Sequence, residues 1–156
     1  MIRAYVRVST ATQATDGFGL DAQVSAILKF WPDGFICFYH DIGVSGTIPI
    51  EEREGGKMLL DDVQEGDTVL AFSVSRISRM VWISSTFLHD MKEKGVNVVC
   101  LDAKDASESP SGALMFHIMA AVSQQDRENI LKITEAGREE KRKIGGDLGG
   151  TVQAWQ

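Results

Sequence analysis

The sequence predicts an α/β fold in which a mostly parallel central sheet is flanked by helices and followed by a long C-terminal helix. Three observations lead to this prediction. Strand-like runs alternate with helical patterns over the first two thirds of the 156-residue chain. Such alternation is typical of parallel strands joined by right-handed crossovers. The last third holds one uninterrupted helical stretch, and the total length suffices for one domain with a sizeable core.

Four strand-like runs are expected to form the sheet, at residues 2–9, 34–39, 67–73 and 96–101. In the first run, "AYVRVS", alternation places Tyr5, Arg7 and Ser9 on one face and the small and branched apolar residues on the other. An arginine on a strand otherwise suited to a core is costly to bury without partners. We therefore expect Arg7 either at an exposed edge of the sheet or held in place for an anion.

Apolar residues at helical spacing predict helices over residues 20–31, 53–64 and 83–94, with Gly95 as the C-cap of the third. A fourth helix is expected from about 111 to 143, which would be about 50 Å long if straight. Its first half is apolar from Leu114 to Val122, and its second half is densely charged. This pattern favours an arm that reaches a partner subunit or ligand over a helix that only caps the domain. The Gly-rich residues 145–156 resemble a linker.

Composition narrows the class of protein. No apolar run approaches the length needed to cross a bilayer, and the N-terminus lacks signal-peptide architecture, so we expect a cytoplasmic protein with no membrane partner. Cys37 and Cys100 lie in apolar strand-like runs and are expected to be reduced thiols. The net charge of −6 leans away from a protein that coats nucleic acid, although it leaves room for local basic patches.

Arginines gather where the predicted strands end. Arg7 and Ser9 end the first strand, and "SRISR" directly after the third strand carries Arg76 and Arg79. One turn of helix would place these two arginines on the same face. Arg53 follows the loop "DIGVSGT" after the second strand. Arg127 lies on the long helix. When Arg53 or Arg127 is considered alone, its expected role is a surface salt bridge.

Several arginines around one serine indicate phosphoryl transfer with the serine as nucleophile, because guanidinium groups match phosphate oxygens and stay protonated. Neither a suitable histidine base nor metal-ligand spacing is present in the sequence. "GVSGT" is not the nucleophile elbow of a hydrolase. The three histidines are isolated and are expected to be structural or at the surface: His40, His89 and His117.

These motifs resemble the serine site-specific recombinases, the family of resolvases, DNA invertases and large serine integrases. "YVRVSTATQ" matches the family's opening Y-x-R-V-S-T-x-x-Q, and "GFGLDAQ" is closest to its integrase form. "DIGVSGT…R" resembles the loop after the second strand, and "SRISR" resembles D-R-L-[GS]-R. "SGALMFHIMAAVSQQDRENI" is similar to the start of the long dimerisation helix. The matches run in order and cover about residues 2–145.

The resemblance implies site-specific DNA recombination with Ser9 as the nucleophile. Ser9 would attack a DNA phosphodiester and form a 5′-phosphoserine link. The other implied catalytic residues would bind the scissile phosphate: Arg7, Arg76, Arg79 and, from a mobile loop, Arg53. The implied substrate-binding residues are Gln13, Gln23 and Arg127. The family's mechanism needs no metal and no small-molecule cofactor, and its members act on DNA as homodimers that assemble to a tetramer. Residues 1–144 would then be the catalytic domain, with the long helix for dimerisation and 145–156 as a tail.

Three departures from the family pattern keep a second reading open, that of a catalytically impaired dimerising remnant. Ser75 stands where the family has aspartate in D-R-L-[GS]-R. The stretch "ENILKI" has fewer arginines than the family's long helix, and the family's DNA-binding module has no counterpart here. An unrelated receiver-like domain is a third reading, but it would need acidic residues where this chain has arginines.

Overall fold

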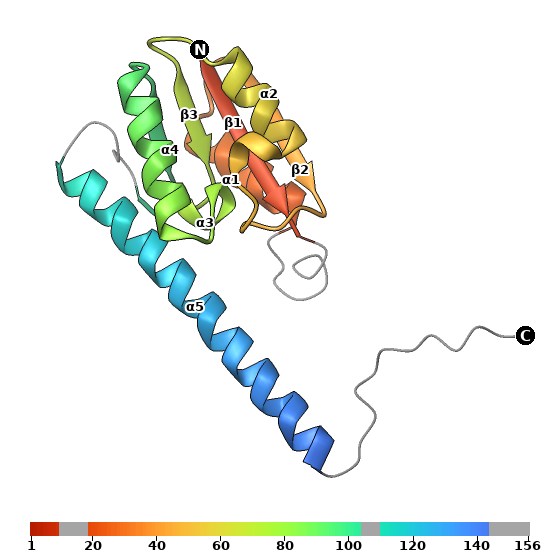
Figure 1. Ribbon diagram of the computed structural model, residues 1–156. Coiled ribbons are helices and arrows are strands. Elements are labelled where there is room, and N and C mark those ends of the chain that lie inside the picture. Colours follow the sequence, from red (N-terminus) through yellow and green to blue (C-terminus); the bar gives the residue numbers. More distant parts are fainter. Residues whose placement is uncertain (10–18, 104–109, 144–156) are drawn as a thin grey trace, which may run out of the picture. The chain divides into compact units, whose positions relative to one another are not determined.

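A computed structural model describes residues 1–9, 19–103 and 110–143 of the protein (Figure 1). The chain contacts divide it into two units, Met1–Gln124 and Gln125–Gln156, which are described separately. The elements are β1 (Ile2–Val8), α1 (Leu20–Phe30), β2 (Ile36–Ile42), η1 (Ile50–Glu52), α2 (Glu54–Asp62), β3 (Thr68–Ala71), α3 (Val74–Ile77), α4 (Val81–Glu93), β4 (Asn97–Cys100) and α5 (Pro110–Lys143).

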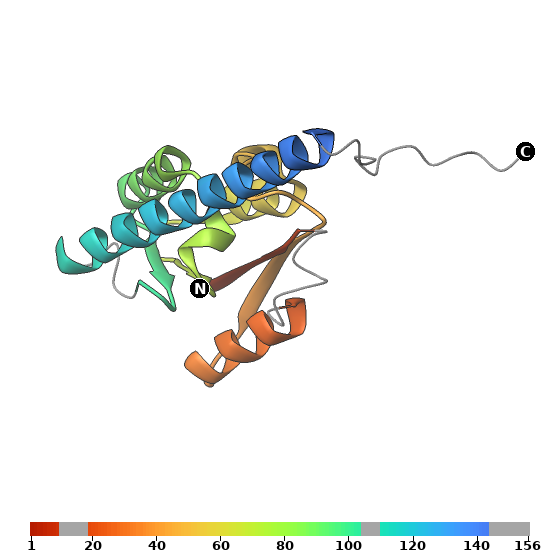
Figure 2. The same cartoon turned by 90° about the horizontal axis from the view of Figure 1, so that it is seen from below.

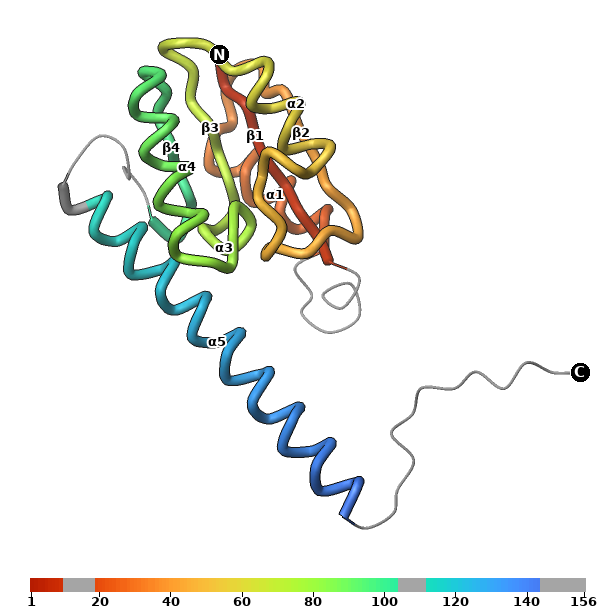
Figure 3. Tube along the Cα trace, viewed as in Figure 1, coloured from red at the N-terminus to blue at the C-terminus, as the bar shows by residue number. Residues whose placement is uncertain are grey.

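The four strands form one parallel sheet in the order β2-β1-β3-β4, which confirms the predicted fold class. In Figure 2, α1 lies on one side of the sheet and α2 and α4 lie on the other. The tube in Figure 3 follows β1 between β2 and β3. Because β1 is a central strand, Arg7 does not lie at an exposed edge, and that half of the prediction is wrong.

Each face of the sheet has its own apolar core. On the α1 side, Ala4, Val6 and Leu70 pack with Ile27. On the other side, Tyr5 and Val69 belong to a larger cluster that includes residues of α2, α4 and the first part of α5. The alternation along β1 predicted this division of its side chains correctly.

Several element boundaries differ from the prediction by one to three residues, and two of the larger differences are at the ends of the second and third strands. The second strand runs to Ile42 rather than ending at 39, because the carboxylate of Asp41 is buried with hydrogen-bond partners instead of facing a turn. The third strand ends at Ala71, and the short helix α3 follows it. Gly95 ends α4 with φ +68° in a Schellman motif, in which the Val96 N–H donates to the Met91 carbonyl.

The long helix is confirmed as α5, whose 34 residues would span about 51 Å. Within the first unit, its buried residues Phe116 and Ala120 join the larger core, while Leu114 and Ile118 are exposed. Both cysteines are free thiols, as predicted. Among the described residues, no helix is long and apolar enough to cross a membrane.

Candidate active site

The predicted arginines converge at the carboxyl end of β1, within the first unit. Arg7 is the penultimate residue of that strand and is fully buried. Arg53, Arg76 and Arg79 lie close enough for their charges to act on Arg7. Ser9 follows β1 directly and is partly buried. The structure thus brings four of the five predicted catalytic residues into one cluster, with the predicted nucleophile two residues along the chain from Arg7.

Backbone carbonyls hold the guanidinium group of Arg7. Its Nη1 donates to the Val44 carbonyl at 2.7 Å, its Nη2 to the Ser75 carbonyl at 2.9 Å, and its Nε to the Arg76 carbonyl at 3.1 Å. Carbonyl dipoles therefore satisfy a buried cation from three directions. The side chain is fixed between the loop after β2 and helix α3.

Arg53 is also buried, so its expected role as a surface salt bridge is wrong. Its Nε and Nη2 donate to the Ile48 carbonyl at 2.9 and 2.7 Å, and its Nη1 donates to the Tyr5 hydroxyl at 2.9 Å. The Tyr5 hydroxyl in turn donates to the Asp41 carboxylate at 2.7 Å. Asp41 accepts hydrogen bonds from two N–H groups in the first turn of α2, those of Gly55 and Gly56. These contacts connect Arg53 to β1, β2 and α2.

The loop 43–49, expected to be mobile, is docked on the cluster through the Gly46 carbonyl. That oxygen accepts from the Arg79 N–H at 2.9 Å, from the Ser78 hydroxyl at 3.1 Å and from Arg53 Nη2 at 3.4 Å. A Cβ at position 46 would lie 2.8 Å from Arg7 Nη2. Only glycine permits this close approach.

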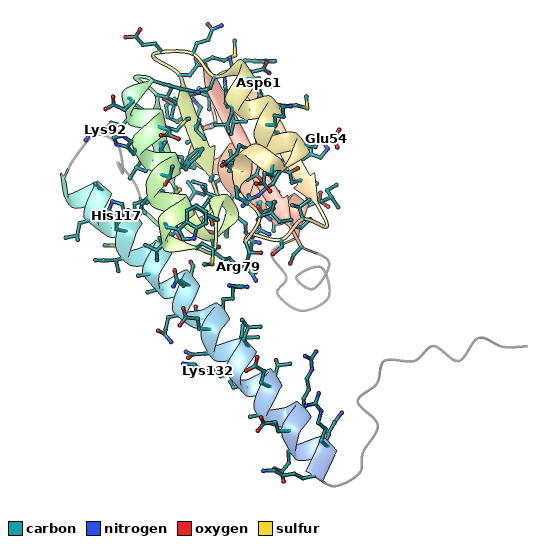
Figure 4. All side chains as sticks on the ribbon, viewed as in Figure 1. Glu54, Asp61, Arg79, Lys92, His117 and Lys132 are labelled. Carbon is teal, nitrogen blue, oxygen red and sulfur yellow. The ribbon has the colours of Figure 1, made fainter. Side chains whose placement is uncertain are left out.

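Arg76 and Arg79 do not share a helical face, which corrects the prediction from their spacing. Helix α3 ends at Ile77, and Ser78 is fully extended with φ −157° and ψ 156°. Arg76 is therefore in the helix and buried, whereas Arg79 lies beyond it and is partly exposed. Figure 4 shows Arg79 at the end of the first unit where α3 ends.

Gln23 lies inside the protein, where its side-chain amide pairs with the backbone of β1. Its Nε2 donates to the Arg7 carbonyl at 3.0 Å, and its Oε1 accepts from the Arg7 N–H at 3.3 Å. Because this amide is fully buried, Gln23 positions the strand end in this structure. Gln13 lies outside the described residues. Arg127 belongs to the second unit, where it is partly buried on α5.

The electrostatics of the cluster are strongly positive. Burial, and then the charges of Arg53, Arg79 and Arg76, lowers the pKa of Arg7 to about 9. Burial raises the pKa of Tyr5, so its hydroxyl stays protonated and continues to donate to Asp41. Within the described ranges, no group of three or more acidic, histidine or cysteine side chains could hold a metal ion. The arrangement is suited to an anion that approaches the partly exposed Arg79.

Sequence reasoning missed Tyr5, Asp41 and Ser78, each of which positions an arginine or its loop. Tyr5 shares a face of β1 with Arg7, and the register of the sheet sets Asp41 beside Arg7. The first of these relations was visible in the alternation of the strand. The second depends on the pairing register, which the sequence does not show.

Comparisons with known proteins agree with this geometry. A family model described as "Resolvase, N terminal domain" matches residues 2–147. The serine recombinase gin of Escherichia phage Mu is 33% identical over 149 residues, which cover 94% of this chain and 72% of that protein. A putative DNA recombinase of Bacillus subtilis is 30% identical over 147 residues, which cover 93% of this chain but 29% of that protein's length.

A solved structure is also similar. The N-terminal catalytic domain of TP901-1 integrase superposes with a TM-score of 0.63 at 28% sequence identity, over 81% of this chain and 96% of that one. The likeness therefore extends over most of the described fold.

Proposed function

The chain belongs to the family of resolvase N-terminal domains, and from this premise we propose that it cleaves and rejoins DNA in site-specific recombination with Ser9 as the nucleophile. The observation that carries the proposal is the cluster of four arginines at the carboxyl end of β1, next to Ser9. Such clusters stabilise the charge that develops on a phosphate during transfer.

The proposed step is a transesterification. The Ser9 oxygen bonds to the phosphorus of a DNA phosphodiester and the bond from phosphorus to the 3′ oxygen breaks. The serine loses a proton and the leaving 3′ oxygen gains one. The product is a 5′-phosphoserine and a free 3′-hydroxyl. Attack by a 3′-hydroxyl on the phosphoserine reverses the step and rejoins the strand, so no outside energy source is required.

The contacts of the arginines suggest two different roles. Arg79 is partly exposed, and we assign to it the direct contact with the phosphate. Arg76 is buried, and its Nη1 donates to the Arg7 carbonyl at 3.4 Å. Arg7 and Arg53 are held by carbonyl oxygens and the Tyr5 hydroxyl. We assign to these two the stabilisation of the developing charge from behind the site, because a buried charge acts strongly over short distances.

The first part of α5 is proposed as the surface that pairs two copies of the chain, as a step toward the family's tetramer. Leu114, Met115, Ile118 and Val122 are exposed there, while Phe116 and Ala120 on the same helix are buried. An apolar stripe of this kind marks an interaction site. Ile118→Glu is expected to shift the sedimentation of the protein from dimer to monomer, and an unchanged distribution would exclude this surface.

A second candidate function is a dimerising remnant that no longer cuts DNA. Ser75 in place of the family's aspartate favours it. The two candidates make opposite predictions about covalent attachment to DNA, which an experiment decides directly.

The test fuses the chain to an unrelated zinc-finger module and offers DNA in which two finger sites flank a cleavage centre. Tethering supplies a local concentration of roughly millimolar, so occupancy does not depend on the chain's own affinity for DNA. The reaction is quenched with detergent, and protein attached to DNA is compared for the wild type and Ser9→Ala. An adduct that is absent in Ser9→Ala supports the enzyme. A folded, DNA-bound fusion that forms no adduct supports the remnant.

A further inference from the structure

The segment 74–81 carries Arg76 and Arg79 and contains the starts of helices α3 and α4. At each start, a backbone N–H donates to a side chain from a distant part of the chain. At the start of α3, the Val74 N–H donates to the Asp102 carboxylate, at 3.0 and 3.3 Å from its two oxygens. At the start of α4, the Val81 N–H donates to Gln124 Oε1 at 3.1 Å. The first N–H groups of a helix have no partner within the helix, so such acceptors fix where it begins.

The residues that normally cap these helices do not do so here. Ser73 precedes α3, but its hydroxyl lies 2.8 Å from that of Ser75 and makes no cap. Met80 precedes α4, and its side chain makes no cap hydrogen bond. The two caps therefore come from Asp102, two residues after β4, and from Gln124 on α5.

The position of this segment determines the geometry of the arginine cluster. The carbonyls of Ser75 and Arg76 hold the Arg7 guanidinium, and the Arg76 carbonyl also accepts from Arg53 at 3.2 Å. The Arg79 N–H donates to the loop at Gly46. A shift of either helix start would move carbonyls or arginines at the site.

The second of these caps, Gln124, connects the start of α4 to α5. The first part of α5 is fixed in the core by Phe116 and Ala120. It also meets α4 through Ser85 Oγ and His117 Nδ1, which lie 3.2 Å apart. Gln124 on α5 accepts the N–H of Val81, the first residue of α4, which lies two residues after Arg79 in the chain.

We propose that Asp102 and Gln124 are positioning residues that hold the arginine segment 74–81 in its reactive geometry, and that α5 acts on the site through Gln124. The inference rests on the proposed function for its effect on cleavage. The geometric part, that these caps fix the segment, can be tested without DNA.

The cleavage test uses Gln124→Met, which keeps the size of the side chain and removes the acceptor. Gln124→Glu keeps an acceptor and is the conservative variant. Ser85→Ala is the matched control, because it removes a different hydrogen bond between α4 and α5. The rate of Ser9 adduct formation is measured on saturating DNA with the zinc-finger fusions, together with DNA affinity and thermal unfolding.

We expect Gln124→Met to slow adduct formation at least tenfold at unchanged DNA affinity, since small displacements of catalytic groups have large effects on rate. Gln124→Glu and Ser85→Ala should stay within about threefold of the wild type. Asp102→Ala should slow the reaction as Gln124→Met does, and Asp102→Asn, which keeps an acceptor, should recover most of the rate. Equal slowing in Ser85→Ala and Gln124→Met would overturn the proposal, because the effect would then be a general loss of stability.

Hydrogen exchange at the Arg79 amide provides the second arm, in the unfused chain. This N–H donates to the Gly46 carbonyl at 2.9 Å. Exchange should be at least tenfold faster in Gln124→Met than in Ser85→Ala. Unchanged exchange would overturn the inference even if cleavage were observed. If the wild type formed no adduct, the proposed function would fail and exchange alone would decide the inference.

Discussion

Replacing Tyr5 with phenylalanine removes one hydroxyl group that links two buried charges. The hydroxyl accepts from Arg53 Nη1 at 2.9 Å and donates to the Asp41 carboxylate at 2.7 Å. The ring is retained, so the packing of the core and the contact between the Arg53 guanidinium and the ring, at 5.9 Å from its centroid, are preserved. The substitution therefore tests the hydrogen bonds alone.

The expected loss of stability depends on the hydrogen bonds that Arg53 and Asp41 keep in the variant. A hydrogen bond to a charged group contributes about 1.5–3 kcal/mol. Arg53 Nη1 retains the Arg76 carbonyl, and Asp41 retains the N–H groups of Gly55 and Gly56. Two such bonds would contribute about 3–6 kcal/mol, and because both charges keep other partners we expect a loss of about 3 kcal/mol in the free energy of unfolding, at the lower end of that range.

Urea unfolding of the unfused chain measures this loss, and Tyr39→Phe is the matched control. Tyr39 lies beside Tyr5 in the sheet and is also buried. Its hydroxyl accepts from Arg3 at 2.6 Å and donates to Asp62 at 2.9 Å, away from the arginine cluster. Both variants should lose similar stability, but only Tyr5→Phe should slow adduct formation by the zinc-finger fusion, by roughly tenfold.

Two results would refute this reasoning. A loss below about 0.5 kcal/mol in Tyr5→Phe would mean that the hydroxyl is not needed to satisfy the two charges. Equal slowing of adduct formation in Tyr39→Phe would mean that stability, rather than the position of Arg53, controls the rate.

Three further predictions concern single positions. Gly46→Ala should lower the free energy of unfolding by about 1–3 kcal/mol, because its Cβ would collide with the fixed Arg7 guanidinium; Gly19→Ala, with open space around its Cβ, should change little. Burial opposes the charge on Asp67, but hydrogen bonds to it outweigh this and lower its pKa. The stabilisation is present above the unfolded pKa of about 3.9 and is lost as pH falls further. Asp67→Asn should thus flatten the acid side of the stability profile in urea unfolding. Ser75→Asp should increase the rate of adduct formation, and an unchanged time course would show that the missing carboxylate is not limiting.

Much of the site could be predicted from the sequence because it depends on where strands end. In a parallel sheet the carboxyl ends of the strands meet at one edge, so residues following different strands converge there. The positions of Arg7 and Arg76 follow from this rule, and the helical spacing of apolar residues was enough to predict α5.

The remainder depends on contacts that no local pattern encodes. Taken alone, Arg53 was expected at the surface, because its local sequence does not show that the hydroxyl of Tyr5, 48 positions away, accepts a hydrogen bond from it. The strand β2 continues through Asp41 because of partners on β1 and α2. Similarly, α3 ends after four residues because Ser78 turns toward the Gly46 carbonyl, a contact between segments 32 residues apart.

The most direct test of the central claim is to identify the amino acid that carries the DNA. The adduct formed by the tethered protein is digested with nuclease and protease, and the peptide that retains a nucleotide is sequenced by mass spectrometry. The account predicts a phosphodiester link on Ser9, in the peptide that contains Val8 and Ser9. A nucleotide attached to any other residue, or a cleaved DNA with no protein attached, would contradict it.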